Sequence, residues 1–233
     1  MTTRLVNWPQ AWRIIASRYP PIALFERLTA DPAVWDALIA LEQLTNPRVR
    51  DDVGDIALVP ADERIAGPGA SYVMASFTHL NPKGSRFSDG SYGVYYAAAE
   101  LETAIAETVF HFEEFARDSA DPPRMEDMRV LVGVVAADFE DIDALPEPLR
   151  SQVLDPASYG ASRSHAKQSR DGGALGVVYP SVRRLGGACI GAFRPRGVGL
   201  PHQERNLKYR WNGARVDRYF DYQRDLWIDL HDR

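Results

Sequence analysis

The stretch GSRFSDGSYGVYYAAAELETAIAE, residues 84–107, decides the fold and the site that this sequence predicts. It begins as a loop of glycine and serine around Arg86, continues as a β-forming run with two tyrosines, and ends in a helix that carries Glu107. A loop of small residues lets a ligand approach the backbone, and an arginine fork matches phosphate oxygens. Tyr95 or Tyr96 can stack on a planar ring, and a carboxylate such as Glu107 can bind ribose hydroxyls and stabilise positive charge. Taken singly, each of these residues is more common as a surface charge or a core aromatic, but the ordering predicts a site for a phosphate-bearing and ribose-bearing ligand.

The predicted helix after Glu100 has one apolar face. Its apolar positions recur at the i, i+3, i+4 spacing of a buried stripe: Leu101, Ala104, Ile105, Thr108, Phe112 and Phe115. On this helical wheel Glu107 and His111 lie on the flank of the stripe, whereas Glu113 and Glu114 point to solvent. A flanking carboxylate can face a cleft between the helix and a sheet.

A second candidate segment is residues 176–183, GVVYPSVR. Pro180 ends a predicted strand, so the hydroxyl of Ser181 can point into a cleft and bind a ribose, phosphate or amide group. The alternative is a plain strand-ending turn. A nucleophilic role for Ser181 is not supported, because G-x-S-x-G is absent. His79, which precedes the Arg86 loop, is a second-tier candidate for substrate binding, with a structural histidine as the alternative.

Composition limits the classes of function. The 233 residues are 45% hydrophobic, enough for one substantial core, and the net charge of -5 disfavours nonspecific binding to nucleic acid or an anionic membrane. Cys189 is the only cysteine, so an internal disulfide and a thiolate metal cluster are excluded, and no histidine spacing predicts a metal site. The sequence begins without an apolar leader and contains no run long enough for a membrane helix, so we expect a cytoplasmic protein.

The coarse pattern predicts an α+β fold with a mixed or antiparallel sheet. Asp31-Pro32 resembles a helix start and Asn46-Pro47 a helix end, and together with the apolar segment 22–28 this predicts that about the first 45 residues are helical. Strands are predicted at residues 72–77, 94–98, 130–136, 175–179 and 189–193. The polar stretch 158–173 is predicted to be a mobile surface loop beside the site. We expect a single domain over residues 1–233, with a helical N-terminal extension at 1–70 and a catalytic core at 71–233.

A hairpin is predicted near the C-terminus. Asn212-Gly213 is the two-residue signal for a type I′ turn. That turn would set Trp211 opposite Ala214, Tyr209 opposite Val216, and Lys208 opposite Asp217 as an ion pair.

The motifs GSRF at Arg86, GVYYAAAELETAIAE ending at Glu107, and VVYPSVRRLGG around Ser181 together resemble the RES family, toxins of bacterial toxin-antitoxin pairs. The resemblance runs from about Arg13, in the segment AWRI, to the C-terminal hairpin. It places Tyr96 rather than Tyr95 at the family's tyrosine, although a shift of one residue leaves Tyr95 open.

The resemblance implies a fold similar to the ADP-ribosyltransferase toxins and NAD+ as the substrate, with no metal. It implies either transfer of ADP-ribose to a protein, such as phosphoribosyl pyrophosphate synthetase, or hydrolysis or phosphorolysis of NAD+. The partner it implies is an antitoxin, usually with an Xre-like region, that blocks the active site. On this basis Glu107 would stabilise the charged sugar, Arg86 would bind the diphosphate or ribose, Tyr96 would stack on a ring, and Ser181 would anchor the ribose or nicotinamide. The rival hypothesis is an RNA-directed toxin or noncatalytic binding module that uses the arginine clusters, which the acidity of the chain disfavours.

Overall fold

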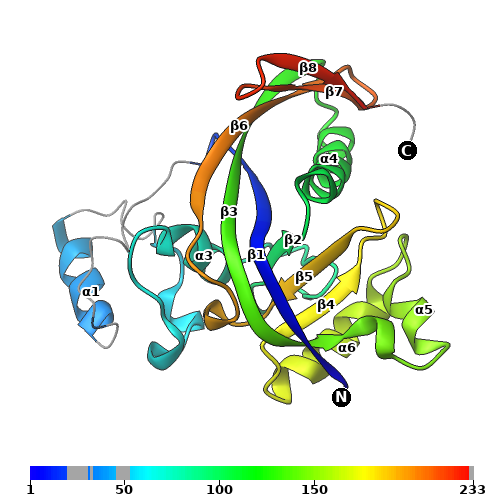
Figure 1. Cartoon of the computed structure of the whole chain (residues 1–233). Coiled ribbons are helices and arrows are strands. Elements are labelled where there is room, and N and C mark those ends of the chain that lie inside the picture. Colours follow the sequence, from blue (N-terminus) through cyan, green and yellow to red (C-terminus); the bar gives the residue numbers. More distant parts are fainter. Residues whose placement is uncertain (20–30, 32–33, 46–52, 231–233) are drawn as a thin grey trace.

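The structure is a computed structural model that describes residues 1–19, 31, 34–45 and 53–230. An eight-stranded mixed sheet lies at its centre, with helices on both sides (Figure 1). The strands are β1 (Thr3–Ala16), β2 (Tyr95–Ala98), β3 (Arg124–Asp141), β4 (Gly176–Pro180), β5 (Ala188–Ala192), β6 (His202–Trp211), β7 (Val216–Asp221) and β8 (Leu226–Asp229). The helices are α1 (Trp35–Thr45), α3 (Ala70–Thr78), α4 (Leu101–Asp118), α5 (Leu149–Val153) and α6 (Gly160–Asp171), with short 3-10 turns η2 (Ile56–Leu58), η3 (Ala61–Glu63), η4 (Ile142–Ala144) and η5 (Pro195–Gly197). The predicted α+β class with a mixed sheet is confirmed.

Five of these strands close into a ring. They run in the order β1-β2-β5-β4-β3, and β3 also pairs with β1 along most of its length. The other edge of β3 changes neighbours, because residues 124–132 pair with β6 whereas Glu140 and Asp141 pair with β4 in parallel. Figure 1 shows the result, with the long curved strands β1, β3 and β6 forming a wall and the short strands β4 and β5 diverging from its lower part.

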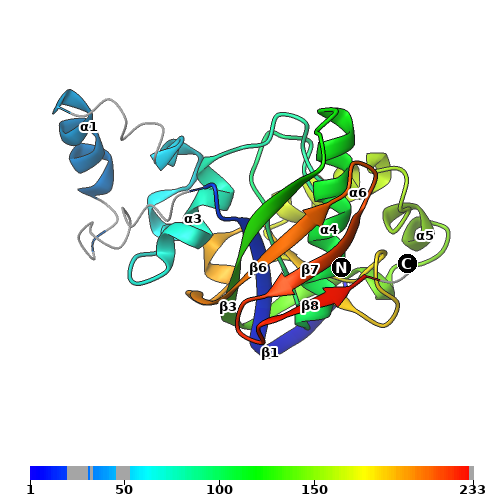
Figure 2. The ribbon, with the colours of Figure 1, turned by 90° about the horizontal axis from the view of Figure 1, so that it is seen from above.

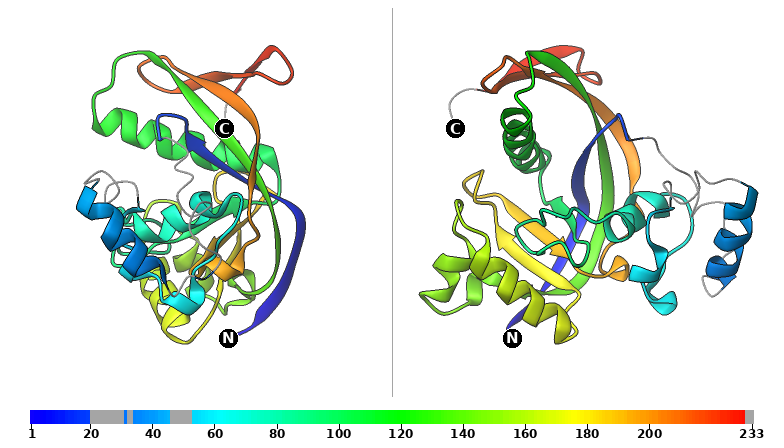
Figure 3. Two further views of the ribbon diagram at one scale, coloured as in Figure 1. Left: turned by 90° about the vertical axis from the view of Figure 1, so that its left-hand side faces the viewer. Right: turned by 180° about the vertical axis from the view of Figure 1, so that it is seen from behind.

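The two sides of the wall are covered by different helices. In Figures 1 and 2, α4 lies on one side of the long strands, and α3 and α1 lie on the other. On the α4 side, Phe112 packs edge-on against Trp211 at a centroid distance of 6.3 Å. On the other side, Trp35, Met74 and Phe139 belong to a second buried cluster. The views in Figure 3 show α5 and α6 together beside β4, and the sheet is therefore packed on both faces.

The N-terminal prediction is wrong for residues 3–16, which form β1 instead of a helix. The pairing with β3 shifts register between Trp8 and Ala11, and the buried residues Val6, Ala11 and Ile14 follow no strict alternation. This bulge hides the period of two that would have indicated a strand. The later helix is confirmed as α1, while segment 22–28, Pro32 and Asn46-Pro47 lie outside the described residues.

Residues 72–77 were predicted as a strand and are part of α3. Ala70, Val73, Met74, Phe77 and Thr78 are buried, at the i, i+3, i+4, i+7, i+8 spacing of a helix. Their spacing, and not the β-forming character of Tyr72 and Val73, determines the element. The other four predicted strands are confirmed as β2, part of β3, β4 and β5.

The polar stretch 158–173 was predicted as a loop, but most of it forms α6. Its buried face consists of small residues, Ser162, Ala166 and Ser169, so no apolar stripe marks it in the sequence. Ser162 Oγ donates a 2.7 Å hydrogen bond to the main-chain oxygen of Arg86. The helix therefore supports the candidate loop directly.

The C-terminal hairpin is confirmed, but its predicted register is wrong. Asn212 N donates to Arg215 O at 3.1 Å, and Asn212 Oδ1 accepts from the Ala214 and Arg215 amides, so the connection is longer than two residues. Trp211 therefore lies opposite Val216, and Tyr209 opposite Tyr219. The predicted ion pair also changes: Asp217 binds Arg210, while Lys208 lies 3.6 Å from Asp127.

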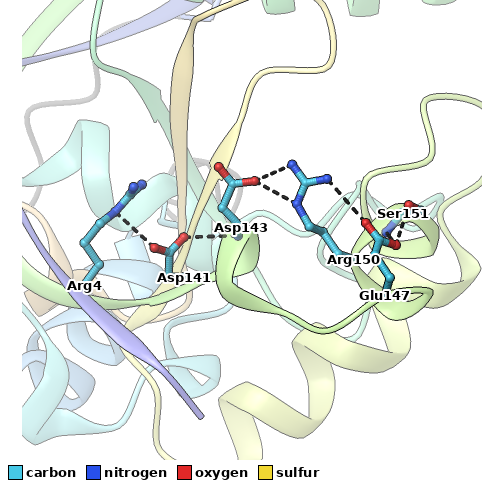
Figure 4. A network of polar contacts seen from close by, with 6 residues as sticks. All are labelled: Arg4, Asp141, Asp143, Glu147, Arg150 and Ser151. Carbon is cyan, nitrogen blue, oxygen red and sulfur yellow. Dashed lines mark hydrogen bonds and ion pairs between the residues drawn. The ribbon is translucent and has the colours of Figure 1, made fainter.

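A polar network fixes the segment that follows β3 (Figure 4). It comprises Arg4, Asp141, Asp143, Glu147, Arg150 and Ser151. Arg4 of β1 lies 3.6 Å from Asp141, and Arg150 of α5 donates to Asp143 at 2.9 Å through Nε. These partly exposed pairs each contribute little to stability. They hold α5 in place, and the end of α5 and the residues directly after it supply two main-chain carbonyl oxygens, of Val153 and Asp155, to Arg86 of the candidate site.

Candidate active site

A cavity of about 730 Å³ lies between α4, the strands β1 and β2, the loop at 81–86 and the start of α6. Its volume is in the range of small-molecule sites. Along α4 the lining residues follow one helical stripe: Ala104, Glu107, Thr108, His111, Glu114, Phe115, Arg117 and Asp118. The predicted buried stripe is therefore displaced, because Phe115 is 50% exposed and faces this cavity.

Of the two glutamates predicted to face solvent, Glu114 is exposed as predicted, whereas Glu113 is not. Glu113 is largely buried and accepts a 2.7 Å hydrogen bond from the Val216 amide, which ties α4 to β7. Glu114 is half exposed and lines the cavity. The flanking position predicted for Glu107 and His111 agrees with the structure, since both line the cavity.

Glu107 is held from the β4–β5 turn. Ser181 Oγ donates a 2.6 Å hydrogen bond to Glu107 Oε1. The same Oγ accepts from the amides of Arg183 and Arg184 at 3.1 and 3.0 Å. Because both donors point at the lone pairs of the hydroxyl, its proton is directed to the carboxylate. Ser181 is 9% exposed and is not among the described residues that line the cavity.

Two further groups lie beneath Glu107. Cys189 Sγ is 3.9 Å from Glu107 Oε1, and Cys189 lies opposite Tyr179 in the β4–β5 pair. Burial, and then the neighbouring Glu107, raises the pKa of the Cys189 thiol well above its usual value. Burial also raises the pKa of Tyr179. Both side chains therefore stay neutral, and Glu107 is the acidic group of this part of the cavity.

Arg86 is buried with its guanidinium held on two sides. Nη1 donates to Asp155 O at 2.9 Å and to Val153 O at 3.4 Å. Its guanidinium carbon lies 4.6 Å from the centre of the Tyr159 ring. Arg86 lines the cavity, and its contacts with these carbonyls use Nη1 only, so Nε and Nη2 are the donors that a ligand can meet.

The loop before Arg86 is braced by α6 and by β2. Arg163 donates to Ser85 O and Lys83 O, each at 2.9 Å. Gly84 has φ +73°, and a Cβ there would lie 2.3 Å from the oxygen of Ser88, so the turn requires glycine. The glycine and serine residues of the opening sequence stretch therefore set the loop's conformation.

Tyr95 and Tyr96 point to opposite faces of β2. Tyr96 lines the cavity, and its hydroxyl accepts from Phe87 N at 3.0 Å and bonds Ser85 Oγ at 2.8 Å. Burial raises the pKa of Tyr96 to about 12, so the hydroxyl stays protonated. Tyr95 belongs to the apolar cluster on the other face. His79 bonds Thr78 Oγ1 at 3.1 Å, and neither Tyr95 nor His79 is among the described residues that line the cavity.

The chain matches the model of a known protein family over most of its length. A family model described as the RES domain matches residues 62–212. This chain belongs to the RES domain family. The match contains the Arg86 loop, Tyr96, Glu107 and Ser181, and the resemblance indicated by the motifs is confirmed.

Two individual proteins are similar to this RES domain chain. "Uncharacterized protein y4oC" of Sinorhizobium fredii (strain NBRC 101917 / NGR234) is 32% identical over 205 residues, which cover 88% of this chain and 84% of that protein. The crystal structure of the M. tuberculosis MbcT-MbcA toxin-antitoxin complex matches 91% of this chain and 88% of that chain, with a TM-score of 0.44 and 9% identity. That structural likeness is too distant to bear on function. Within the described residues, no helix of this RES domain chain has the length and apolar character to cross a membrane.

Sequence reasoning missed Arg13 of β1, which lies outside the stretch matched as a RES domain. Arg13 lines the cavity, and its guanidinium donates to Tyr96 O and Ser76 Oγ, each at 3.0 Å. It also lies 4.5 Å from the centre of the Tyr95 ring. Burial lowers the pKa of Arg13, and the nearby tyrosines oppose that shift. The segment AWRI was already part of the family resemblance, but because a helix was expected there, Arg13 was not predicted to reach the site.

Proposed function

We propose that this RES domain protein is the toxin of a toxin-antitoxin pair that binds NAD+ in the α4 cavity and breaks the bond between nicotinamide and ribose. Membership of the RES domain family supports NAD+ as the substrate, because NAD+ is the substrate that the resemblance of the motifs to this family implies. The observation on which the proposal depends is the convergence of Arg86, Tyr96 and Glu107 on one cavity, with Ser181 bound to Glu107. These side chains come from four separate elements of the fold.

The charge of the cavity suits the substrate. Near the 81–86 loop, its lining includes the buried Arg86 and the partly buried Arg163. A diphosphate binds best where arginine forks present paired donors. Glu107 lies on the opposite wall, α4, so a dinucleotide bound to the arginines can place a ribose next to the carboxylate.

The chemistry requires a positioned carboxylate more than a strong acid. Nicotinamide leaves NAD+ as a neutral molecule, and the bond electrons go to its ring nitrogen, so no proton is needed on the leaving group. The sugar becomes oxocarbenium-like, and a fixed negative charge nearby stabilises it. Ser181 occupies Oε1 of Glu107, which leaves Oε2 to face the ribose. Tyr96 contributes a buried ring that can pack against a planar group of the ligand.

The acceptor in this proposal is a protein side chain. Phe115 is 50% exposed at the cavity, and Leu185, in the turn that carries Ser181, is fully exposed. Exposed apolar side chains beside a site are suited to contact with a second protein. An antitoxin, Xre-like in this proposal, would cover the same face and exclude NAD+.

Incubation of the purified protein with NAD+ tests the proposal. We expect free nicotinamide, measured by chromatography, and an ADP-ribose adduct on an acceptor protein, measured by mass spectrometry. Free ADP-ribose alone would indicate hydrolysis, and ADP-ribose 1″-phosphate in phosphate buffer would indicate phosphorolysis. No nicotinamide release with any of these acceptors would contradict the proposal.

Ser181→Ala should weaken catalysis without unfolding the protein. The change removes the donor to Glu107 Oε1, so the carboxylate loses its fixed orientation. We expect kcat for nicotinamide release to fall about tenfold, the equivalent of one hydrogen bond of about 1.5 kcal/mol, with KM for NAD+ little changed. Steady-state kinetics give both values.

Ser169→Ala is the matched control for Ser181→Ala. Ser169 Oγ also donates to a buried carboxylate, that of Glu140, but neither residue lines the cavity. The control should lose a similar amount of unfolding free energy and keep its kcat. Equal kcat in Ser181→Ala and Ser169→Ala would show that Ser181 does not position Glu107.

A further inference from the structure

His111 lies one turn of α4 beyond Glu107, on the same cavity wall. Residues four apart on a helix share a face, and their Cα atoms differ by about 6 Å along the axis. His111 is about half exposed and stands nearer the open end of the cavity than Glu107, in the part that Phe115 and Asp118 also line. The position is where an acceptor would enter.

A carboxylate orients the His111 ring. His111 Nδ1 is 3.2 Å from Glu114 Oε2. A carboxylate partner on one imidazole nitrogen selects the tautomer with its proton on that nitrogen. Nε2 then carries the free lone pair and can accept a proton. The Phe110 ring packs edge-on against the imidazole at 5.2 Å, which restricts its orientation further.

The other charged side chains near His111 are paired with different residues. Arg117 Nη2 binds Glu113 at 2.8 Å, and Lys83 Nζ lies 3.6 Å from Asp118. Glu114 is therefore the charged group in contact with the ring. This arrangement differs from an arbitrary surface pair on a helix, because both members line the cavity that contains Glu107.

We propose that His111 is the general base that activates the acceptor of ADP-ribose, with Glu114 as its positioning residue. The inference rests on the proposed function. As the bond between C1′ of the ribose and nicotinamide breaks, its electron pair leaves with nicotinamide. An oxygen or nitrogen of the acceptor bonds to C1′ and loses its proton to His111 Nε2, which later releases that proton to solvent. Glu107 stabilises the charged sugar, and His111 acts on the incoming group.

His111→Ala tests this assignment. General bases contribute about 100-fold or more, so kcat for nicotinamide release should fall about 100-fold, while KM for NAD+ changes by less than about threefold. Added imidazole should restore part of the lost rate, because a free base can occupy the space left by the ring. Glu114→Gln should lower kcat by about tenfold, since an amide can donate to Nδ1 as well as accept from it and no longer selects the tautomer with the proton on Nδ1. Rates are measured with the acceptor that the unmodified protein uses fastest.

His202→Ala is the matched control, because His202 is an exposed histidine of β6 and not among the described residues that line the cavity. It should keep the original kcat. His111→Gln is measured beside His111→Ala, with circular dichroism and thermal unfolding for both, so that a folded variant without the base is available. If the unmodified protein releases nicotinamide, two results would overturn the role of His111 and leave the proposed function standing. One is an unchanged kcat in folded His111→Gln. The other is a loss of kcat in His111→Ala that added imidazole does not restore. Absence of release from the unmodified protein would instead contradict the proposed function.

Discussion

Glu107→Gln is expected to reduce nicotinamide release from NAD+ about 1,000-fold, the upper range for loss of one electrostatic stabiliser of a transition state. The amide keeps the size of the side chain, and its oxygen can still accept the hydrogen bond from Ser181. What it loses is the negative charge that stabilises the oxocarbenium-like sugar. Because NAD+ itself is bound mainly by the arginines in this proposal, KM should change much less than kcat.

Glu102→Gln provides the control for this variant. Glu102 is an exposed glutamate in the first turn of α4 and is not among the described residues that line the cavity. Both variants should unfold at similar temperatures. If Glu107→Gln turned over NAD+ at the rate of Glu102→Gln, the catalytic carboxylate would have to be another residue.

Arg86→Met is expected to lower kcat/KM for NAD+ by about 150-fold or more. Two charge-assisted hydrogen bonds to a phosphate contribute about 3 kcal/mol at the low end, and each 1.4 kcal/mol corresponds to a factor of ten. Methionine fills part of the buried space but offers no donor. Direct binding of NAD+, measured by calorimetry, should weaken in parallel, because Arg86 binds the substrate in its ground state.

Arg64→Met separates binding from folding in this experiment. Arg64 is another buried arginine, 8% exposed, whose Nε donates to Val59 O at 2.9 Å and whose Nη2 donates to Ile56 O at 3.4 Å. It resembles Arg86 in holding two main-chain carbonyls, but it is not among the described lining residues. Both variants should lose unfolding free energy. Equal NAD+ affinity in the two would remove Arg86 from the binding site.

Local signals predicted the parts of the fold that depend on short stretches. The strand at β2, the helix α4 and the hairpin β6–β7 all formed where the pattern indicated. At β1 and α6 the prediction failed because a tertiary neighbour supplied what the local sequence lacked, whereas at α3 the helical spacing was present in the sequence and was overlooked. The long strand β1 is specified by its pairing with β3, and α6 packs a face of small residues that no hydrophobic period reveals.

Some residues of the candidate site were also predictable from local sequence, whereas others depend on the tertiary structure. The residues of the 84–107 stretch were predictable because a loop, a strand and a helix follow each other directly there. The alternation of β2 then separates Tyr96 from Tyr95, a distinction of one residue that the sequence left open. The hydrogen bond of Ser181 to Glu107 was not predictable, because it depends on how the β4–β5 turn meets α4. Arg13 required the whole course of β1 to be known.

A polypeptide that began at residue 62 would contain the complete family match but would lack β1, the strand that pairs with both β2 and β3. Without Thr3–Ala16 the ring of strands opens, and two edges with free amides and carbonyls face solvent. Such edges pair with other chains and promote aggregation. We therefore expect the smallest unit that folds by itself to extend beyond the family match and to include β1, and we expect a truncation series to lose soluble protein as soon as its deletions enter β1.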